Sequence, residues 1–182
     1  MIDTLERDIA LCLAEQDRDA ARADLIHFAC YVDPPAAQQY SAAHLRTIAD
    51  VLMRVERGEL RRVIIAVPPR HWKSSLASEK FSAWWLGKRM AAGEPNASII
   101  VASYALSLAE KFSKSTREII SGDKYRQVFP GVRIKRDSNS ADDWLLEGGY
   151  RTTFRAVGTG GGISGHGARL ILLDEVSDPH TT

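Results

Sequence analysis

A lysine followed by two serines, Lys73-Ser74-Ser75, stands between an apolar run and a helical pattern. The apolar run, residues 63–67, is rich in β-branched residues and has the length of a buried strand. The apolar spacing that follows predicts a helix over 73–87. The first N–H groups of a helix are unsatisfied and partly positive, so they attract phosphate oxygens. In this layout Lys73 reaches the β- and γ-phosphates of a nucleotide, and Ser74 offers its hydroxyl to Mg²⁺.

The loop departs from the usual phosphate-loop pattern, G-x-x-x-x-G-K-[ST], at both of its glycine positions. Val67 stands at the first and Trp72 at the second. Glycine is normally used where backbone approaches phosphate closely or takes a positive φ. A phosphate site therefore needs support from a second part of the chain.

That support comes from four apolar residues, 170–173, which are followed by Asp174 and Glu175. The pattern predicts a buried parallel strand with carboxylates at its C-terminal end, where open α/β sheets bind ligands. Asp174 would hold Mg²⁺, through water, and Glu175 would polarise the attacking water. Arg70, inside the loop, would stabilise the charge that spreads over the transferring phosphoryl group, although a solvated loop charge is the competing interpretation.

With these motifs the chain resembles the N-terminal ATPase domain of the large terminase subunit of tailed bacteriophages, the motor that packages DNA into a capsid. The resemblance runs from about residue 30 to the end. It is carried by residues 67–74 (Val-Pro-Pro-Arg-His-Trp-Lys-Ser), 102–105 (Ala-Ser-Tyr-Ala), 158–168 (the glycine-rich segment), 172–175 (Leu-Leu-Asp-Glu) and 178–180 (Asp-Pro-His).

The resemblance implies a P-loop NTPase fold of the ASCE or RecA-like type: a mostly parallel sheet flanked by helices, with an inserted β-hairpin. It implies ATP and Mg²⁺ as cofactors. The implied partners are double-stranded DNA, the small terminase subunit and the portal or procapsid. The resemblance also implies a homo-oligomeric ring and a location in the cytoplasm of a bacterial host. Motor ATPases of this kind often contact the adenine edge with a glutamine that precedes the loop. Gln39 or Tyr40 could have this role here. The alternative interpretation is that these residues are only the polar start of a helix. The nucleotide-binding residues implied are Gln39, Pro69, Arg70, His71, Trp72, Lys73, Ser74 and Ser75, with Ser74 and Asp174 on the metal.

The 182 residues are enough for one domain with a sizeable core, and the net charge of +1 gives no general sign of nucleic-acid binding. Cys12 and Cys30 lack metal-site spacing, and no apolar run approaches the ~20 residues of a membrane span. We expect an N-terminal helical segment over 1–35 and a P-loop domain over 36–182. We expect that domain to be incomplete, lacking its last core strands and a nuclease domain.

Other elements follow from periodicity and turn residues. Helices are expected at 4–31 (with a break near 16–19), at 42–57 with Ser41 as N-cap, and at 105–121. A loop is expected at 87–96 and a strand at 97–103. A loose basic stretch at 124–136 could contact DNA or simply be solvated. A hairpin around Gly148-Gly149 should span 144–157, and the six-glycine segment 158–167 should lie near the nucleotide or the DNA path.

Two other functions compete with the packaging motor. One is a different motor ATPase such as a helicase, which the Pro-Pro-Arg-His sequence of the loop disfavours. The other is a degenerate nucleotide-binding or assembly module without hydrolysis, which Trp72 makes plausible.

Overall fold

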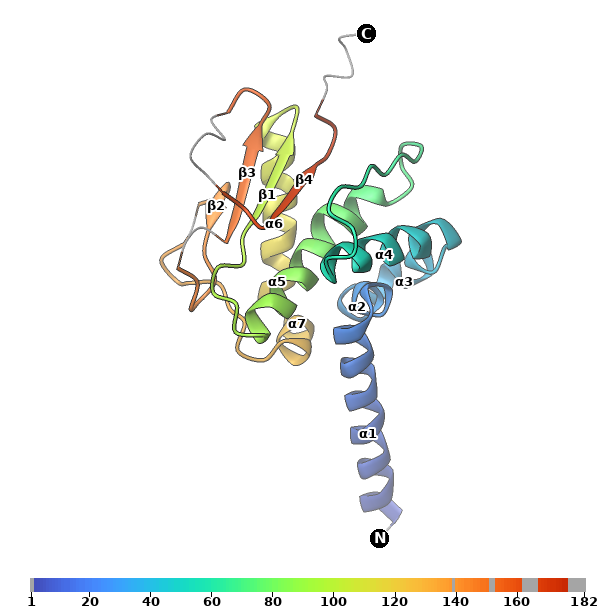
Figure 1. Ribbon diagram of the computed structural model, residues 1–182. Coiled ribbons are helices and arrows are strands. Elements are labelled where there is room, and N and C mark those ends of the chain that lie inside the picture. The colour runs from blue at the N-terminus through green and yellow to red at the C-terminus, as the bar shows by residue number, and fades with distance from the viewer. Residues whose placement is uncertain (1, 139, 151–152, 162–166, 177–182) are drawn as a thin grey trace.

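The computed structural model describes residues 2–138, 140–150, 153–161 and 167–176. A long first helix, α1, projects from a body in which short helices lie beside a small sheet (Figure 1). The helices are α1 (Ile2–Ala23), α2 (Leu25–Val32), η1 (Pro34–Ala36), α3 (Ala37–Tyr40), α4 (Ala43–Glu56), η2 (Ser75–Lys80), α5 (Phe81–Ala91), α6 (Leu106–Ser121) and α7 (Asp123–Val128). The strands are β1 (Ile99–Ser103), β2 (Asp143–Trp144), β3 (Phe154–Gly158) and β4 (Leu170–Leu173).

The sheet has the order β2-β3-β1-β4 and is mixed. β1 is parallel to both β3 and β4, while β2 is antiparallel to β3. The prediction of a mostly parallel sheet is therefore wrong, because the sheet includes the antiparallel pair β2–β3. The physical reason is the hairpin around Gly148, which has a φ of +79°: its second strand, β3, joins the main sheet beside β1 and brings the short antiparallel β2 with it.

The strand expected at residues 63–67 does not form. Residues 62–68 have no regular secondary structure and contain no turn. Ile64 is 96% exposed, which is the opposite of the predicted burial. A strand needs a neighbour about 4.8 Å away, and this segment is separated from β4 by a cavity whose lining includes residues of both. β4 is consequently an edge strand, with Ile171 and Leu173 exposed, rather than the buried strand that its composition suggested.

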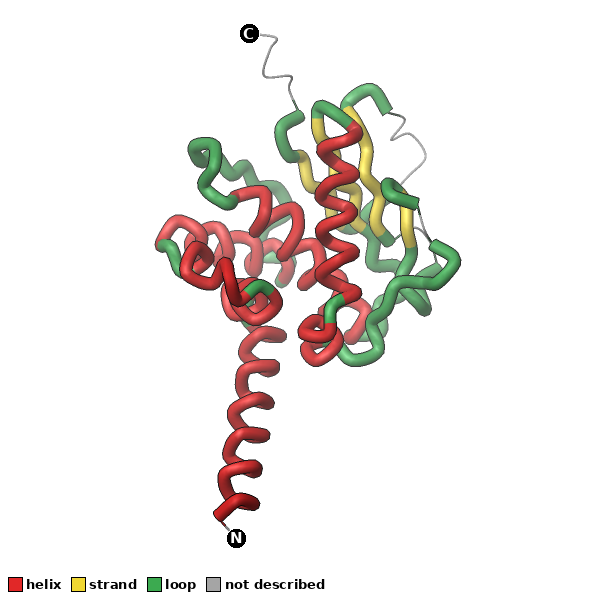
Figure 2. Tube along the Cα trace, turned by 180° about the vertical axis from the view of Figure 1, so that it is seen from behind, coloured by secondary structure: helices red, strands yellow, loops and turns green. Residues whose placement is uncertain are grey.

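Helices cover one face of this sheet. α6 lies across β1 and β3 (Figure 2), and the main core fills the space between it, α5, α2, α4 and the sheet. α5 continues through Gly87 to Ala91, where a loop was expected over 87–96, and the Phe129 ring packs against the helix at Gly87. A Cβ at Gly87 would lie 2.4 Å from that ring, so only glycine permits the approach.

The other helix boundaries differ from expectation by local causes. The first helix breaks at Asp24, not at 16–19, because the Asp24 carboxylate accepts the His27 N–H and starts α2 as its N-cap. Ser41 does not cap α4, whose N-cap position is held by Ala42. The basic stretch after α6 begins with a helix, α7, whose Tyr125 and Val128 are buried.

Three expectations fall outside the described residues: the middle of the glycine-rich segment (162–166), part of the hairpin (151–152) and the Asp-Pro-His motif at 178–180. Across the described helices, none combines the length and the apolar character that crossing a membrane requires.

Candidate nucleotide-binding site

The helix that follows the loop starts at Lys73 and runs without interruption through η2 and α5 to Ala91. Its first complete turn, η2, is π-helical: the Phe81 N–H bonds the carbonyl of Leu76, five residues back. Single π-helical turns within α-helices are frequent at functional sites. This turn carries Ser78 beside the end of β4, as its contact below establishes.

Lys73 and Asp174, about a hundred residues apart in sequence, meet at the C-terminal end of β4. Lys73 Nζ lies 3.0 Å from Asp174 Oδ1. Asp174 is only 4% exposed, whereas the lysine side chain is partly open to solvent. Among the described residues Asp174 Oδ1 accepts no hydrogen bond, because the lysine approaches it closely without hydrogen-bond alignment. The two predicted residues thus converge, and one buried carboxylate oxygen keeps an unused lone pair.

Ser78 completes this arrangement, although no motif in the sequence marks it. Its hydroxyl, itself buried, donates to Asp174 Oδ2 at 2.8 Å. Ser78 lies five residues after Lys73, so the π-helical turn brings both side chains to the same carboxylate. A serine five residues beyond a phosphate-loop lysine is too common a feature to have signalled this role in the sequence.

The loop backbone takes the conformation that glycine would favour. Trp72 has a φ of +60° and Arg70 a φ of +63°, both in the left-handed region that costs non-glycine residues energy. His71 fixes the loop from within, since its Nδ1 donates to the carbonyls of Pro68 and Pro69 at 3.1 and 2.8 Å. His44 of α4 donates from Nε2 to the His71 carbonyl at 3.2 Å. The glycine pattern is thus replaced by strained residues that hydrogen bonds hold in place.

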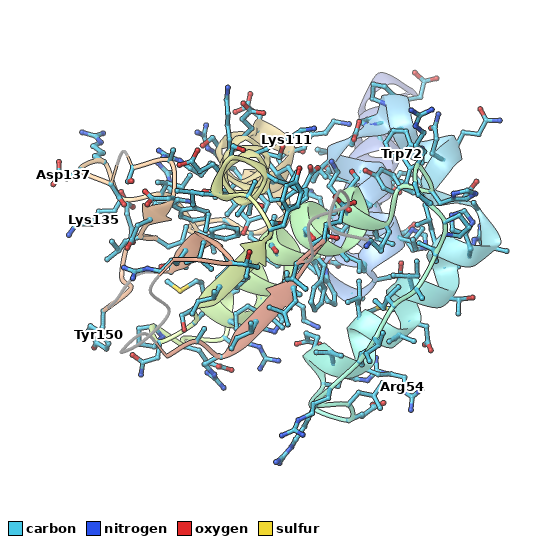
Figure 3. The ribbon with its side chains drawn as sticks, turned by 90° about the horizontal axis from the view of Figure 1, so that it is seen from above. Arg54, Trp72, Lys111, Lys135, Asp137 and Tyr150 are labelled. Atoms are coloured by element: carbon cyan, nitrogen blue, oxygen red, sulfur yellow. The ribbon has the colours of Figure 1, made fainter. Side chains whose placement is uncertain are left out.

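Tyr40 supports the same loop from α3. Its ring packs edge-on against Trp72 at 5.8 Å, and its hydroxyl lies 2.9 Å from Ser75 Oγ. Because Ser75 donates its own proton to Glu79, Tyr40 is the donor to Ser75. Trp72 is 41% exposed and lies on the side of the N-terminal helices, away from Lys135 and Asp137 (Figure 3).

Beside the loop lies a charged cluster of Asp33, Glu79 and Lys80, of which Lys80 is buried and the other two are partly exposed. Lys80 Nζ is 3.2 Å from Asp33 and 3.9 Å from Glu79. Burial alone would lower the pKa of Lys80, but Tyr40, Glu79 and Asp33 together outweigh it and raise that pKa. Burial raises the pKa of Glu79 as well, although Lys80 and Ser75 oppose the shift. The two pKa shifts favour the charged form of Lys80 and the neutral form of Glu79.

The remaining predicted residues lie at the surface around this centre. Glu175 follows Asp174, is exposed and has a φ of +52°. Arg70 and Pro69 are exposed in the loop, and Gln39 is exposed on α3. In the described part of the chain, the side chains of Arg70, Glu175 and Gln39 make no hydrogen bond or ion pair with Lys73 or Asp174.

The ends of β1 and β4 are fastened together at the site. The Ser103 hydroxyl donates to the Asp174 carbonyl at 2.7 Å, and the Tyr104 N–H donates to the Glu175 carbonyl at 2.8 Å. These bonds hold the backbone of both carboxylate residues. Ser103 and Tyr104 thus lie at the end of β1 beside this site.

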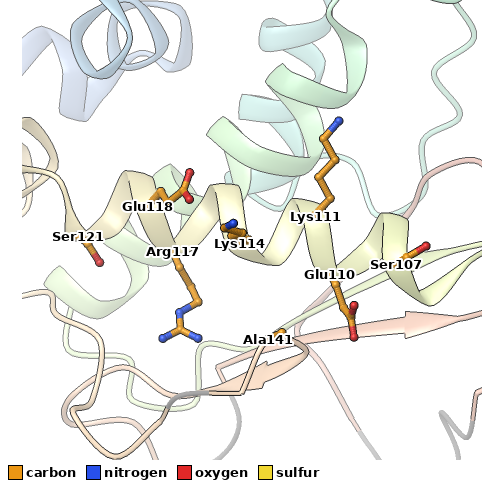
Figure 4. Close-up of a pocket in the computed structure, with 8 residues that line it drawn as sticks. All are labelled: Ser107, Glu110, Lys111, Lys114, Arg117, Glu118, Ser121 and Ala141. Atoms are coloured by element: carbon orange, nitrogen blue, oxygen red, sulfur yellow. The ribbon is translucent and has the colours of Figure 1, made fainter.

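Two cavities are prominent. One, of about 850 Å³, contains Lys73, Ser78 and Asp174 at one end and continues between β4 and the segment before the loop. The other, of about 650 Å³, is a groove along α6 opposite Ala141 (Figure 4). The α6 groove carries side chains of both signs, such as Lys114 and Glu118, so its charge does not select anions. The first cavity is the one that contains the converging residues.

A magnesium ion fits the residues present. No group of three or more His, Cys, Asp or Glu side chains placed to ligate a metal occurs within the described ranges. Magnesium does not need one, because it is usually held by one or two carboxylates, water and substrate phosphates. The buried Asp174 oxygen that accepts no hydrogen bond is a ligand of the required kind, and Ser74 stands at the helix start.

Comparison of the chain with known proteins found no matching protein family, no matching curated protein and no matching solved structure.

Proposed function

We propose that the chain binds magnesium-complexed ATP at the Lys73–Asp174 site and is the ATPase part of a DNA-packaging motor of the phage terminase type. The observation that supports binding is the 3.0 Å approach of Lys73 to a buried carboxylate at the end of β4. The motor, its double-stranded DNA, the small terminase subunit and the procapsid rest on the sequence resemblance, as do the ring and the bacterial cytoplasm.

In this proposal Lys73 leaves Asp174 when nucleotide enters and pairs with the β- and γ-phosphates. Ser74 and Asp174 would hold magnesium, which, when bound, offsets charge on the phosphate oxygens and orients them. Lys73 and the amides that open the helix then hold the phosphates by charge and hydrogen bonding. The cost of separating the lysine from a buried carboxylate is offset only if the metal takes its place.

Two further residues have roles at the reacting phosphate. Glu175 orients the attacking water, and Arg70 stabilises the charge that develops on the transferring group. Both side chains are exposed, so neither requires a buried charge before nucleotide arrives. Phosphoryl transfer depends mainly on positioning and electrostatics, which these side chains supply.

Calorimetric titration of the 182-residue chain with Mg·ATP tests the binding step. We expect one site per chain and a loss of affinity of at least about tenfold in Lys73→Ala, since a phosphate contact from a charged donor is worth about 1.5–3 kcal/mol. Lys114→Ala is the matched control, because Lys114 is exposed on α6 and has no ion pair within the described residues. Equal affinity of Lys73→Ala and wild type would refute the site.

Binding without hydrolysis is the second candidate, and the position of Glu175 favours it. The Glu175 residue is exposed, and its backbone has a left-handed conformation. Phosphate release from Mg·ATP, measured for wild type and Glu175→Gln, separates the two functions. A wild-type rate that Glu175→Gln abolishes supports the ATPase, whereas titratable binding with no release above the variant's rate supports the binding module.

A further inference from the structure

The loop backbone between Pro68 and His71 receives a single hydrogen bond from another element in the described part of the chain. The donor is His44 Nε2 on α4, and the acceptor is the His71 carbonyl, 3.2 Å away. The other two bonds of this stretch are internal, from His71 Nδ1 to the carbonyls of Pro68 and Pro69. No backbone group of residues 61–71 pairs with another backbone group across the described ranges. The conformation of the loop therefore depends strongly on His44.

His44 stands on a well-packed helix. It is the second residue of α4, and Leu45 and Ile48 of the same helix are buried in the main core. The His44 ring also lies edge-on to the His71 ring, with the ring centroids 5.7 Å apart and an angle of 74° between the ring planes. A fixed helix thus holds His71 by a hydrogen bond and by ring packing.

The peptide between His71 and Trp72 has its carbonyl and its N–H on opposite sides, because it is planar and trans. His44 draws the carbonyl toward α4, so the Trp72 N–H points away from His44. No described group accepts this N–H in a hydrogen bond. It directly precedes Lys73, whose Nζ lies 3.0 Å from Asp174 Oδ1. The Trp72 N–H is thus a free donor at the start of the loop helix, of the kind that binds phosphate oxygens.

Backbone strain at Trp72 opposes this orientation of the peptide. Its φ of +60° lies in the left-handed region, which is costly for any residue with a side chain. Turning the 71–72 peptide over by 180° would change that φ from +60° to about −120°, which lies in the broad β region and carries no such cost. The turned peptide would point its carbonyl, instead of its N–H, at a bound phosphate. The bond from His44 opposes this turn, because it holds the carbonyl in place.

We propose that His44 is a positioning residue of the nucleotide site: its bond to the His71 carbonyl keeps the 71–72 peptide in the orientation that presents the Trp72 N–H to phosphate. This inference rests on the proposed function and gives α4 a part in it. Where a phosphate loop has glycine before its lysine, a positive φ is free of strain and no such bond is required. His44 thus compensates for the tryptophan at position 72.

Calorimetric titration of the full chain with Mg·ATP tests the role of the hydrogen bond. His44→Phe retains a ring against His71 but has no donor, and it should weaken ATP binding roughly three- to tenfold, the range expected for one lost hydrogen bond. His44→Gln restores a donor and should bind ATP within about twofold of wild type. His27→Phe is the matched control, because His27 is exposed on α2 and its side chain makes no hydrogen bond among the described residues. Equal affinity of His44→Phe and wild type overturns the proposal, as does a His44→Gln variant that binds no better than His44→Phe.

The same comparison in a Trp72→Gly background separates positioning from a general loss of structure. Glycine takes a φ of +60° without strain, so the turned peptide is no longer favoured. His44→Phe should then weaken ATP binding by less than about twofold, because the two sites no longer depend on each other. A purely structural role of His44 would cost the same affinity in both backgrounds, and that result contradicts the proposal.

A measurement without nucleotide distinguishes failure of this inference from failure of the proposed function. The three-bond coupling between the amide and α protons of Trp72 depends on φ, and it is larger for the turned peptide than for the orientation that His44 holds. The coupling should rise in His44→Phe and keep its wild-type value in His44→Gln. An unchanged coupling in His44→Phe overturns the proposal whether or not ATP binds. A coupling that rises, in a chain whose wild type does not bind Mg·ATP, means that His44 does set the loop conformation and that the proposed function is wrong.

Discussion

The left-handed backbone at Trp72 makes a prediction whose sign is unusual. At an ordinary position a protein with glycine is less stable than one with alanine, because glycine has more conformational freedom in the unfolded chain. The difference is about 0.4–1 kcal/mol. At a φ of +60° alanine carries a steric penalty of about 1–2 kcal/mol that glycine does not. Trp72→Gly should therefore be more stable than Trp72→Ala by about 0.5–1 kcal/mol. Both variants lose the edge-on contact with Tyr40, so the comparison cancels that loss.

Urea unfolding followed by circular dichroism measures the difference. With a slope of about 2 kcal/mol per molar urea, the midpoint of Trp72→Gly should lie about 0.3–0.5 M above that of Trp72→Ala. Lys114→Gly and Lys114→Ala form the control pair, because Lys114 lies at an exposed position inside α6. There alanine should be the more stable by about 1 kcal/mol. If alanine is also the more stable at position 72, the loop does not have this conformation and Lys73 is not presented as described.

Three other predictions concern the groups around the site. Ser78→Ala should lower the free energy of unfolding by about 1.5–3 kcal/mol, because it leaves Asp174 without its neutral hydrogen-bond donor. The control, Ser82→Ala, removes only a bond to a helix carbonyl and should have the smaller effect in urea unfolding. The reverse order of the two effects would contradict the role of Ser78. Burial raises the pKa of Glu79, so its contribution to stability is complete below its ordinary pKa of 4.5 and is lost as the pH rises through the raised value. Urea unfolding between pH 4.5 and 7 should therefore show wild type losing stability relative to Glu79→Gln, and a constant difference would refute this. Tyr40→Phe should destabilise by about 0.5–1.5 kcal/mol through the lost bond to Ser75, and calorimetric unfolding that is unchanged would show that this bond contributes nothing.

The sequence was most informative where chemistry and periodicity coincide. Lys73 and Asp174 each follow an apolar run, and their meeting at one strand end is confirmed. The helices expected over 73–87 and 105–121 and the strand expected over 97–103 follow from apolar spacing and form close to these positions, packed against the core. Such patterns are reliable because one face of each element must be buried.

What the sequence did not reveal depends on contacts between distant residues. Residues 63–67 have the composition of a strand, but a strand forms only where a neighbouring strand accepts its hydrogen bonds, and composition does not report that neighbour. The same limit applies to Gly87, since the close approach of the Phe129 ring, which requires glycine there, cannot be read from the local sequence. Ser78 was missed because its partner lies almost a hundred residues away. The break at Asp24 could have been found, since an aspartate before an apolar run is an N-cap signal.

The dependence of ATP affinity on magnesium, compared between wild type and Asp174→Asn, tests most directly whether the loop and Asp174 hold one metal-bound triphosphate. In wild type, removing magnesium should weaken ATP binding at least about tenfold, because the buried carboxylate then repels the phosphates. In Asp174→Asn that repulsion and the metal ligand are both absent, so removing magnesium should change the affinity for ATP only a little. Without magnesium, the variant should bind ATP more tightly than wild type does. Equal magnesium dependence in the two proteins would contradict a shared site.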